Sequence, residues 1–176
     1  MSEGRWMGIR NITALGALVA AAIAVGADTA LAEIPAAITA PDAMPVATLH
    51  AEGAQIYECK TADDGKLAWA FREPIATLIF DGKTVGRHYT GPVWEHVDGS
   101  SVHGKAVANA PGATGNDIPW LKLEVIGRRG TGVLANADFV QRINTSGGVL
   151  RGPCEQAGAL RSVPYSADYV FLHKGG

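Results

Sequence analysis

The sequence predicts an all-β domain, either an antiparallel β-sandwich or a partly closed barrel of about 8–10 short strands. Two observations lead to this fold class. After residue 32 the chain consists of short runs rich in β-branched and aromatic residues, which Gly, Pro, Asn and Asp separate at a spacing of about nine to twelve residues. No stretch in this part combines a helical period with caps, and the connections are too short for the crossover helices of a parallel sheet.

Residues 1–32 precede the expected strands and have the three-part pattern of a secretory signal peptide. Arg5 and Arg10 make a basic start, residues 12–25 are apolar, and Ala-Leu-Ala at 30–32 is a cleavage site. The apolar run is shorter than the ~20 residues that a membrane-spanning helix needs. We therefore expect cleavage between Ala32 and Glu33, export to the periplasm or the cell exterior, and no membrane span in the chain that remains.

The exported chain divides into an N-terminal arm, residues 33–46, and a single β domain, residues 47–176. The arm contains three prolines and no clear period. In the domain, the run LAWAFR at 67–72 alternates large apolar and smaller residues, as in a strand with one buried face. Asp81-Gly82 is a hairpin turn signal. Strands are expected at 47–52, 54–60, 67–72, 76–80, 85–89, 93–97, 102–107, 120–127, 137–145 and 165–173.

The charge of the chain bounds the kind of partner. The net charge is −2, and the loss of residues 1–32 removes two basic and two acidic residues and leaves it unchanged. No basic run exists beyond Arg128-Arg129, which argues against a nucleic acid or an anionic membrane held by charge. No G-x-G-x-x-G turn follows an expected strand, which argues against dinucleotide binding. We expect the partner to be a small molecule, a glycan or a component of the cell envelope.

Both cysteines, Cys59 and Cys154, lie in the exported part of the chain. Export places them in an oxidising compartment, where two cysteines most simply form a disulfide. A redox-active pair usually has the spacing C-x-x-C, which is absent. The bridge closes a loop of about 95 residues, which stabilises the fold by ~4 kcal/mol in the chain-entropy model.

Segment 85–104 holds three of the five histidines and is the first place to look for a site. One hypothesis is a metal centre in which His88, His96 and His103 bind zinc or copper with a neighbouring acid, because imidazole and carboxylate suit these ions. The alternative, which we favour, is three separate histidines and no cofactor, because a single histidine is a common structural residue. The spacing of the three leaves both interpretations open, since they can converge only through strand pairing.

Ser100 and Ser101 lie in the same segment beside Asp98 and His103, so the residue types of a catalytic triad are present. A triad is recognised by geometry, and its members usually come from distant elements. Asp98-Gly99-Ser100 is more simply a β-turn, in which Asp bonds backbone amides and Gly takes a positive φ. We therefore expect no catalytic residue here.

Aromatic residues and one arginine form the candidate ligand surface. The rings that could stack against a sugar or an apolar ligand, or pack as core, are Trp69, Tyr89, Trp94, Trp120, Tyr165 and Tyr169. His88 lies beside Tyr89 and near Trp94 in the sequence. Arg142 could clamp the carboxylate of a ligand, or pair with an acid on a neighbouring strand.

Six segments in fixed order carry a resemblance to a known family. They are GAQIYECK (53–60), LAWAFREPIATL (67–78), VGRHYTGPVWEHVDGSSVHG (85–104), IPWLKLEV (118–125), VQR…TSGG…C (140–154) and VPYSADYVF (163–171). In this order the chain resembles the DUF3455 family of exported bacterial and fungal proteins, from about residue 53 to residue 171. The resemblance implies export and no particular activity. It covers His88, Pro92, Trp94, Asp98, Gly99, Ser100, Trp120, Arg142, Gly147, Gly148, Cys154, Tyr165 and Tyr169. It does not cover His96 or His103, which weakens a site built on all three histidines.

Overall fold

The computed structural model describes Met1 and residues 33–175. The predicted signal peptide and its cleavage site lie outside the described residues. Within those residues, no helix is long and apolar enough to cross a membrane.

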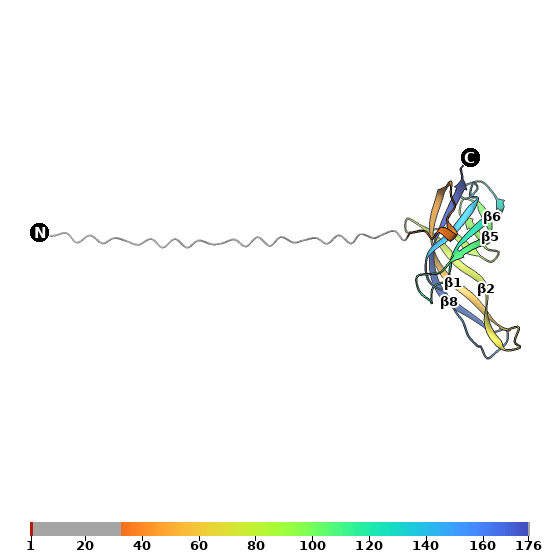
Figure 1. Ribbon diagram of the computed structural model, residues 1–176. Helices are drawn as coiled ribbons and strands as arrows, with labels where there is room; N and C mark the ends of the chain where they lie inside the picture. Colours follow the sequence, from red (N-terminus) through yellow and green to blue (C-terminus); the bar gives the residue numbers. More distant parts are fainter. Residues whose placement is uncertain (2–32, 176) are drawn as a thin grey trace. The chain divides into compact units, whose positions relative to one another are not determined.

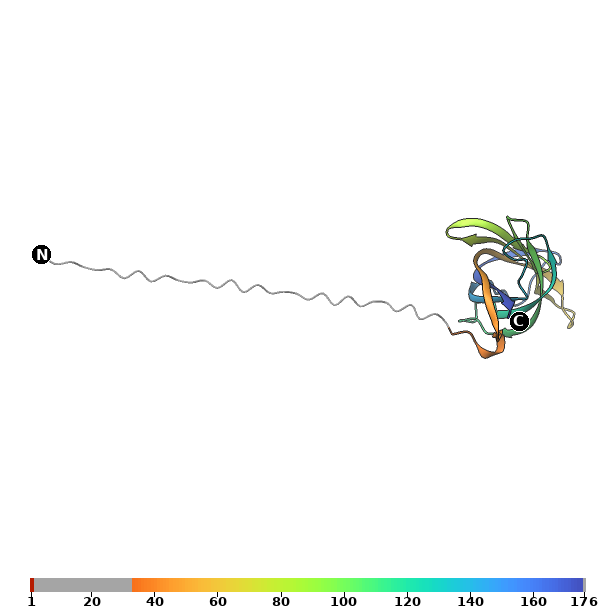
Figure 2. The ribbon, with the colours of Figure 1, turned by 90° about the horizontal axis from the view of Figure 1, so that it is seen from above.

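Residues 33–175 form one antiparallel sheet that closes on itself (Figures 1 and 2). Each strand pairs with the next one along the chain, and the first strand also pairs with the last. The predicted all-β antiparallel class is therefore confirmed, and the closure is complete. The elements are η1 (Ala36–Ile38), β1 (Ala43–Thr61), β2 (Leu67–Phe80), β3 (Lys83–Tyr89), β4 (Val93–His96), β5 (Ser101–Ala110), β6 (Trp120–Arg129), β7 (Phe139–Gly147) and β8 (Leu160–Lys174).

Several strands are longer than the sequence predicts. Expected strands 47–52 and 54–60 are one strand, β1, and expected strands 67–72 and 76–80 are both part of β2. β1 also begins at Ala43, inside the segment assigned to the arm. Gly53 lies within the strand and does not end it. A glycine is needed there because the backbone of β2 passes so close that a Cβ would collide with Ala76. A bulge between Ile56 and Tyr57 then lets the pairing continue with a change of register.

The two faces of the closed sheet bury different clusters. The inner face holds the main core, in which Trp94, Val140, Tyr169 and Phe171 are at most 1% exposed. This cluster follows from strand geometry, since alternate side chains of every strand point inward.

The N-terminal segment covers part of the outer face. Ile38 of η1 is fully buried and packs with Trp120 and Ala110. The Nε2 of Gln141 donates to the Ile38 carbonyl at 2.7 Å, and the Nζ of Lys122 donates to the Thr39 carbonyl at 3.0 Å. Residues 34–39 therefore belong to the packed structure and hold the outer side of β6 and β7.

The predicted disulfide is confirmed. β1, β2 and β8 extend beyond the shorter strands at one end of the sheet (Figure 1). Cys59 lies near the end of β1 and bonds Cys154, which precedes β8, with their Cα atoms 5.9 Å apart. The bond joins residues 95 positions apart and fits a protein of an oxidising compartment.

Candidate functional site

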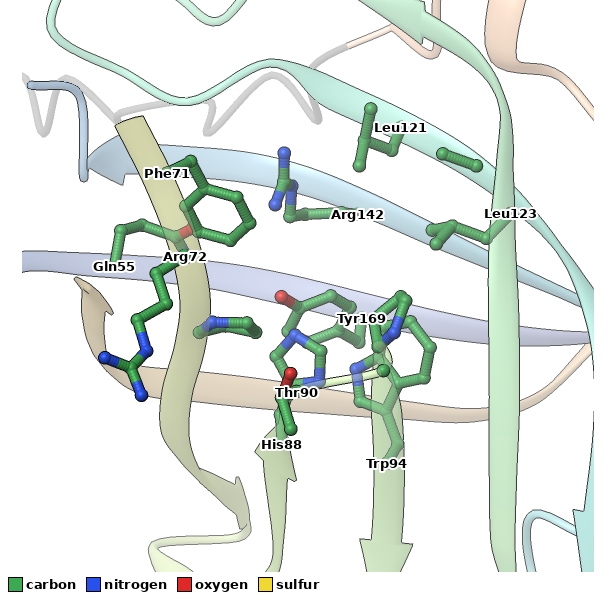
Figure 3. A pocket seen from close by; sticks show the side chains of 14 residues that line it. Gln55, Phe71, Arg72, His88, Thr90, Trp94, Leu121, Leu123, Arg142 and Tyr169 are labelled. Carbon is green, nitrogen blue, oxygen red and sulfur yellow. The ribbon is translucent and has the colours of Figure 1, made fainter. Parts of the chain in front are cut away.

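A cavity of about 450 Å³ lies inside the closed sheet (Figure 3). Every one of the eight strands contributes to its wall, and the turn between β3 and β4 contributes three more residues. The volume falls in the range of small-molecule sites, about 300–1,000 Å³. The lining residues are Gln55, Phe71, Arg72, Pro74, His88, Thr90, Gly91, Pro92, Trp94, Ala106, Leu121, Leu123, Arg142 and Tyr169.

His88 presents a neutral imidazole to this cavity. It lies opposite Ala76 of β2 and Trp94 of β4 and is 3% exposed. Burial lowers its pKa to about 4; a hydrogen bond to Val93 opposes this shift, and the charge of Arg142 adds to it. The Nδ1 is 2.9 Å from the Val93 carbonyl, which can only accept, so Nδ1 carries the proton. Nε2 is then an unprotonated acceptor on the cavity wall, and no described residue bonds it.

Aromatic rings form the wall next to His88. The His88 ring is stacked on Trp94, and Tyr169 lies against both, with its ring centroid 4.9 Å from that of His88 and 5.2 Å from that of Trp94. Gly104 of β5 makes room for the indole, because a Cβ there would stand 3.0 Å from Cζ3 of Trp94. The sequence thus places a glycine where the largest side chain of the wall needs space.

Arg142 contributes a positive charge to the cavity wall. It pairs with Leu121 of β6 and Tyr169 of β8, and its Nε and Nη2 donate to the Pro119 carbonyl at 3.0 and 2.8 Å. Among residues 33–175 no acidic side chain lies within 4.0 Å of it, so the alternative of an ion pair with a neighbouring strand is not observed. Asp138 instead binds Arg128 at 2.6 Å. Burial raises the pKa of the Tyr169 hydroxyl, and the nearby Arg142 opposes that shift.

Two buried N–H groups of the wall have no hydrogen-bond partner among the described residues. They are Nε2 of Gln55, a residue 2% exposed, and Nε1 of Trp94. An unpaired buried donor costs about 1–3 kcal/mol, so such groups are rare in folded proteins.

A family model described as "Protein of unknown function (DUF3455)" matches residues 40–173. The chain belongs to the DUF3455 family. No curated protein and no solved structure matches it. The matched range contains every residue of the cavity wall, so the cavity belongs to the family's own domain.

The structure brings three of the five predicted ligand residues of this DUF3455 chain together. His88, Trp94 and Arg142 line the cavity, and Tyr89 and Trp120 do not. Tyr89 follows the inward-facing His88, so it points to the outer face, where its hydroxyl donates to Glu95 Oε2 at 2.9 Å. Trp120 also faces outward and is covered by η1. These two rings therefore do not face the cavity.

The three histidines of the metal hypothesis are not brought together. His103 follows the buried Val102 on β5 and faces outward, where its Nε2 is 2.7 Å from the Gly91 carbonyl. The Nδ1 of His96 lies 3.0 Å from Asp98 Oδ2. Within the described part of the chain, no group of three or more His, Cys, Asp and Glu side chains could hold a metal ion.

Asp98-Gly99-Ser100 forms the predicted turn, with a φ of 86° at Gly99. The Ser100 hydroxyl is fully buried and donates to Asp98 Oδ1 at 2.6 Å. Burial would raise the pKa of Asp98, but hydrogen bonds from Ser100, from the Val133 amide and from His96 outweigh it and hold the pKa well below its usual range. The Asp98 carboxylate links its own turn to the loop that contains Val133. The buried Ser100 hydroxyl has no access to a substrate.

Sequence reasoning missed Gln55 and Phe71 as cavity residues. Phe71 belongs to the alternating run LAWAFR and was expected to be buried, but it is 54% exposed beside the cavity. Gln55 had one available signal, since it is a polar residue on a strand whose neighbours of the same face are apolar or small. Tyr169 was among the aromatic residues expected either to face a ligand or to pack as core, and it lines the cavity as an almost fully buried residue.

Proposed function

We propose that this DUF3455 protein is an exported, non-catalytic binding protein that holds a small molecule in the cavity of its closed sheet. One observation carries the proposal: all eight strands contribute to the wall of a cavity of about 450 Å³. A wall built from paired strands is rigid, and a pre-formed cavity of this size is the usual architecture of a small-molecule site.

The chemistry of the wall supports binding. Phe71, Leu121 and Leu123 offer apolar surface for the body of a ligand. A small number of polar groups converge on the same space, among them Nε2 of His88 as an acceptor and the guanidinium of Arg142 as a donor. Apolar walls with a few placed polar groups are typical of sites that both hold and orient a ligand.

Two features support export. The first 32 residues have the signal-peptide pattern, and the Cys59–Cys154 disulfide suits the periplasm or the cell exterior. N-terminal sequencing of protein recovered from outside the cytoplasm should begin at Glu33. An unprocessed N-terminus on all recovered protein would contradict this part of the proposal.

The binding proposal is tested with N-phenyl-1-naphthylamine, a neutral dye that fluoresces in apolar surroundings. The purified protein should enhance its fluorescence in a saturable titration. Ala106 lines the cavity and is itself exposed, so Ala106→Trp should fill part of the cavity and weaken binding at least ten-fold. Val107→Trp is the matched control, because Val107 is exposed on the same strand and is not part of the wall. The proposal fails if the dye does not bind, or if both variants bind it like the wild type.

A further inference from the structure

The cavity wall carries positive charge and no negative charge. Two of its residues are arginines, and none is Asp or Glu, although the whole chain has 17 acidic and 15 basic residues. Arg72 is compensated, because its guanidinium lies 3.3 Å from Glu73 and 3.8 Å from Glu58. Arg142 has no such partner within residues 33–175. The uncompensated positive charge of the wall therefore lies at Arg142.

The guanidinium of Arg142 is held in one orientation. Nε and Nη2 share the Pro119 carbonyl, a neutral acceptor that fixes the plane of the group and leaves its charge unbalanced. A guanidinium has five N–H donors, so others remain free for a ligand. Arg142 lines the cavity together with Tyr169 and Leu121, and Figure 3 shows it beside Tyr169. A planar cation that is partly buried is stabilised best by a carboxylate that accepts two parallel hydrogen bonds.

The only acceptor that the described residues offer to the Arg142 guanidinium at hydrogen-bond distance is a neutral carbonyl. A ligand with a negatively charged end would balance the charge that this carbonyl leaves uncompensated.

We propose that the ligand class is an apolar organic acid. Its carboxylate binds Arg142, and its hydrocarbon body lies against Phe71, Leu121 and Leu123. This inference rests on the proposed function, and it adds the charge that the ligand must carry.

The test compares two probes of similar size that differ in charge. 2-Naphthoate carries a carboxylate, and 2-naphthalenemethanol replaces it with a neutral alcohol. Isothermal titration calorimetry on the purified protein should show naphthoate binding at least ten-fold more tightly than the alcohol. Arg142→Met should abolish this preference and leave binding of the alcohol in place, whereas Arg142→Lys should retain part of it. Arg87→Met is the matched control, because Arg87 is an exposed arginine paired with Glu95 and lies outside the wall.

The outcomes separate this inference from the proposed function. Equal affinity of the wild-type protein for both probes overturns the organic-acid inference and leaves the binding cavity standing. A naphthoate preference that survives in Arg142→Met overturns it as well, since another residue would then bind the carboxylate. Failure of both probes and of N-phenyl-1-naphthylamine to bind contradicts the proposed function, and the inference fails with it. If Arg142→Met does not fold, the comparison of the two probes on the wild type still decides.

Discussion

The imidazole of His88 lies flat against the indole of Trp94, with ring centroids 4.5 Å apart and an interplanar angle of 8°. The two residues face each other across β3 and β4, and both are almost fully buried. The stack fixes the imidazole with one nitrogen on the Val93 carbonyl and the other on the cavity wall. Protonation of His88 would place a second positive charge beside Arg142, among buried rings.

The stability of the protein should therefore fall in mild acid because of His88. Its pKa is lowered from 6.5 to about 4 on folding, so between these values the unfolded chain binds the proton and the folded chain does not. The contribution of His88 to the free energy of unfolding is constant above pH 6.5. It falls by roughly 3 kcal/mol as the pH drops to 4. Urea unfolding at several pH values measures this slope. His88→Gln should remove that part of the slope, and an identical slope in wild type and variant would contradict the assignment.

Gly104→Ala should destabilise the fold by about 1–3 kcal/mol, because the added Cβ would crowd Trp94 at 3.0 Å and Leu123 at 3.3 Å. Thermal unfolding measures the loss. Gly127→Ala on the neighbouring β6 is the matched control, since its Cβ would meet only ordinary contacts at 3.6 Å or more. Equal destabilisation by the two changes would show that space beside Trp94 is not the cause.

Removal of the disulfide should lower the free energy of unfolding by ~4 kcal/mol. Dye binding by the folded protein should be unchanged. The bond joins Cys59 to Cys154, and neither residue lines the cavity. The variant with both cysteines changed to Ala should unfold at lower urea concentration and still bind N-phenyl-1-naphthylamine under native conditions. Loss of dye binding from a folded variant would mean that the bridge also shapes the site.

Ile38→Ala should cost about 2–5 kcal/mol, because Ile38 is fully buried between η1 and the outer face of the sheet. Chemical unfolding gives the loss, and dye binding should be unaffected, since the cavity lies on the other face. Ile126→Ala is the control, because that side chain is 56% exposed and its loss should change stability by less than about 0.5 kcal/mol. A neutral effect at Ile38 would show that the N-terminal segment does not stabilise the domain.

The fold class follows from local patterns, but these patterns do not show which face of each strand points inward. The alternation in LAWAFR and the Asp81-Gly82 turn are local signals, and both correspond to β2 and its hairpin. Closure depends on the pairing of β1 with β8, a contact between the two ends of the domain that no local pattern encodes. The length of β1 was missed because Gly53 suggests a break, whereas it permits the close approach of the β2 backbone.

The candidate site was predictable in part for the same reason. His88, Trp94 and Arg142, which the sequence singled out as ligand candidates, line the cavity. Tyr89 adjoins His88 in the sequence and lies on the opposite face, and hydrophobicity alone does not say which of two neighbours on a strand points inward. Trp120 lies on the outer face beneath the segment around Ile38, which is far away in the sequence.

The most direct test of the binding cavity is the NMR spectrum of the indole N–H groups of the ¹⁵N-labelled protein during titration with 2-naphthoate. Trp94 lines the cavity, and Trp120 lies on the outer face beneath η1, so the protein contains its own control. Signals are assigned with Trp94→Phe and Trp120→Phe. We predict a saturable shift of the Trp94 signal and none of the Trp120 signal. A shift confined to Trp120, or no shift of Trp94 at saturating probe, would contradict the account.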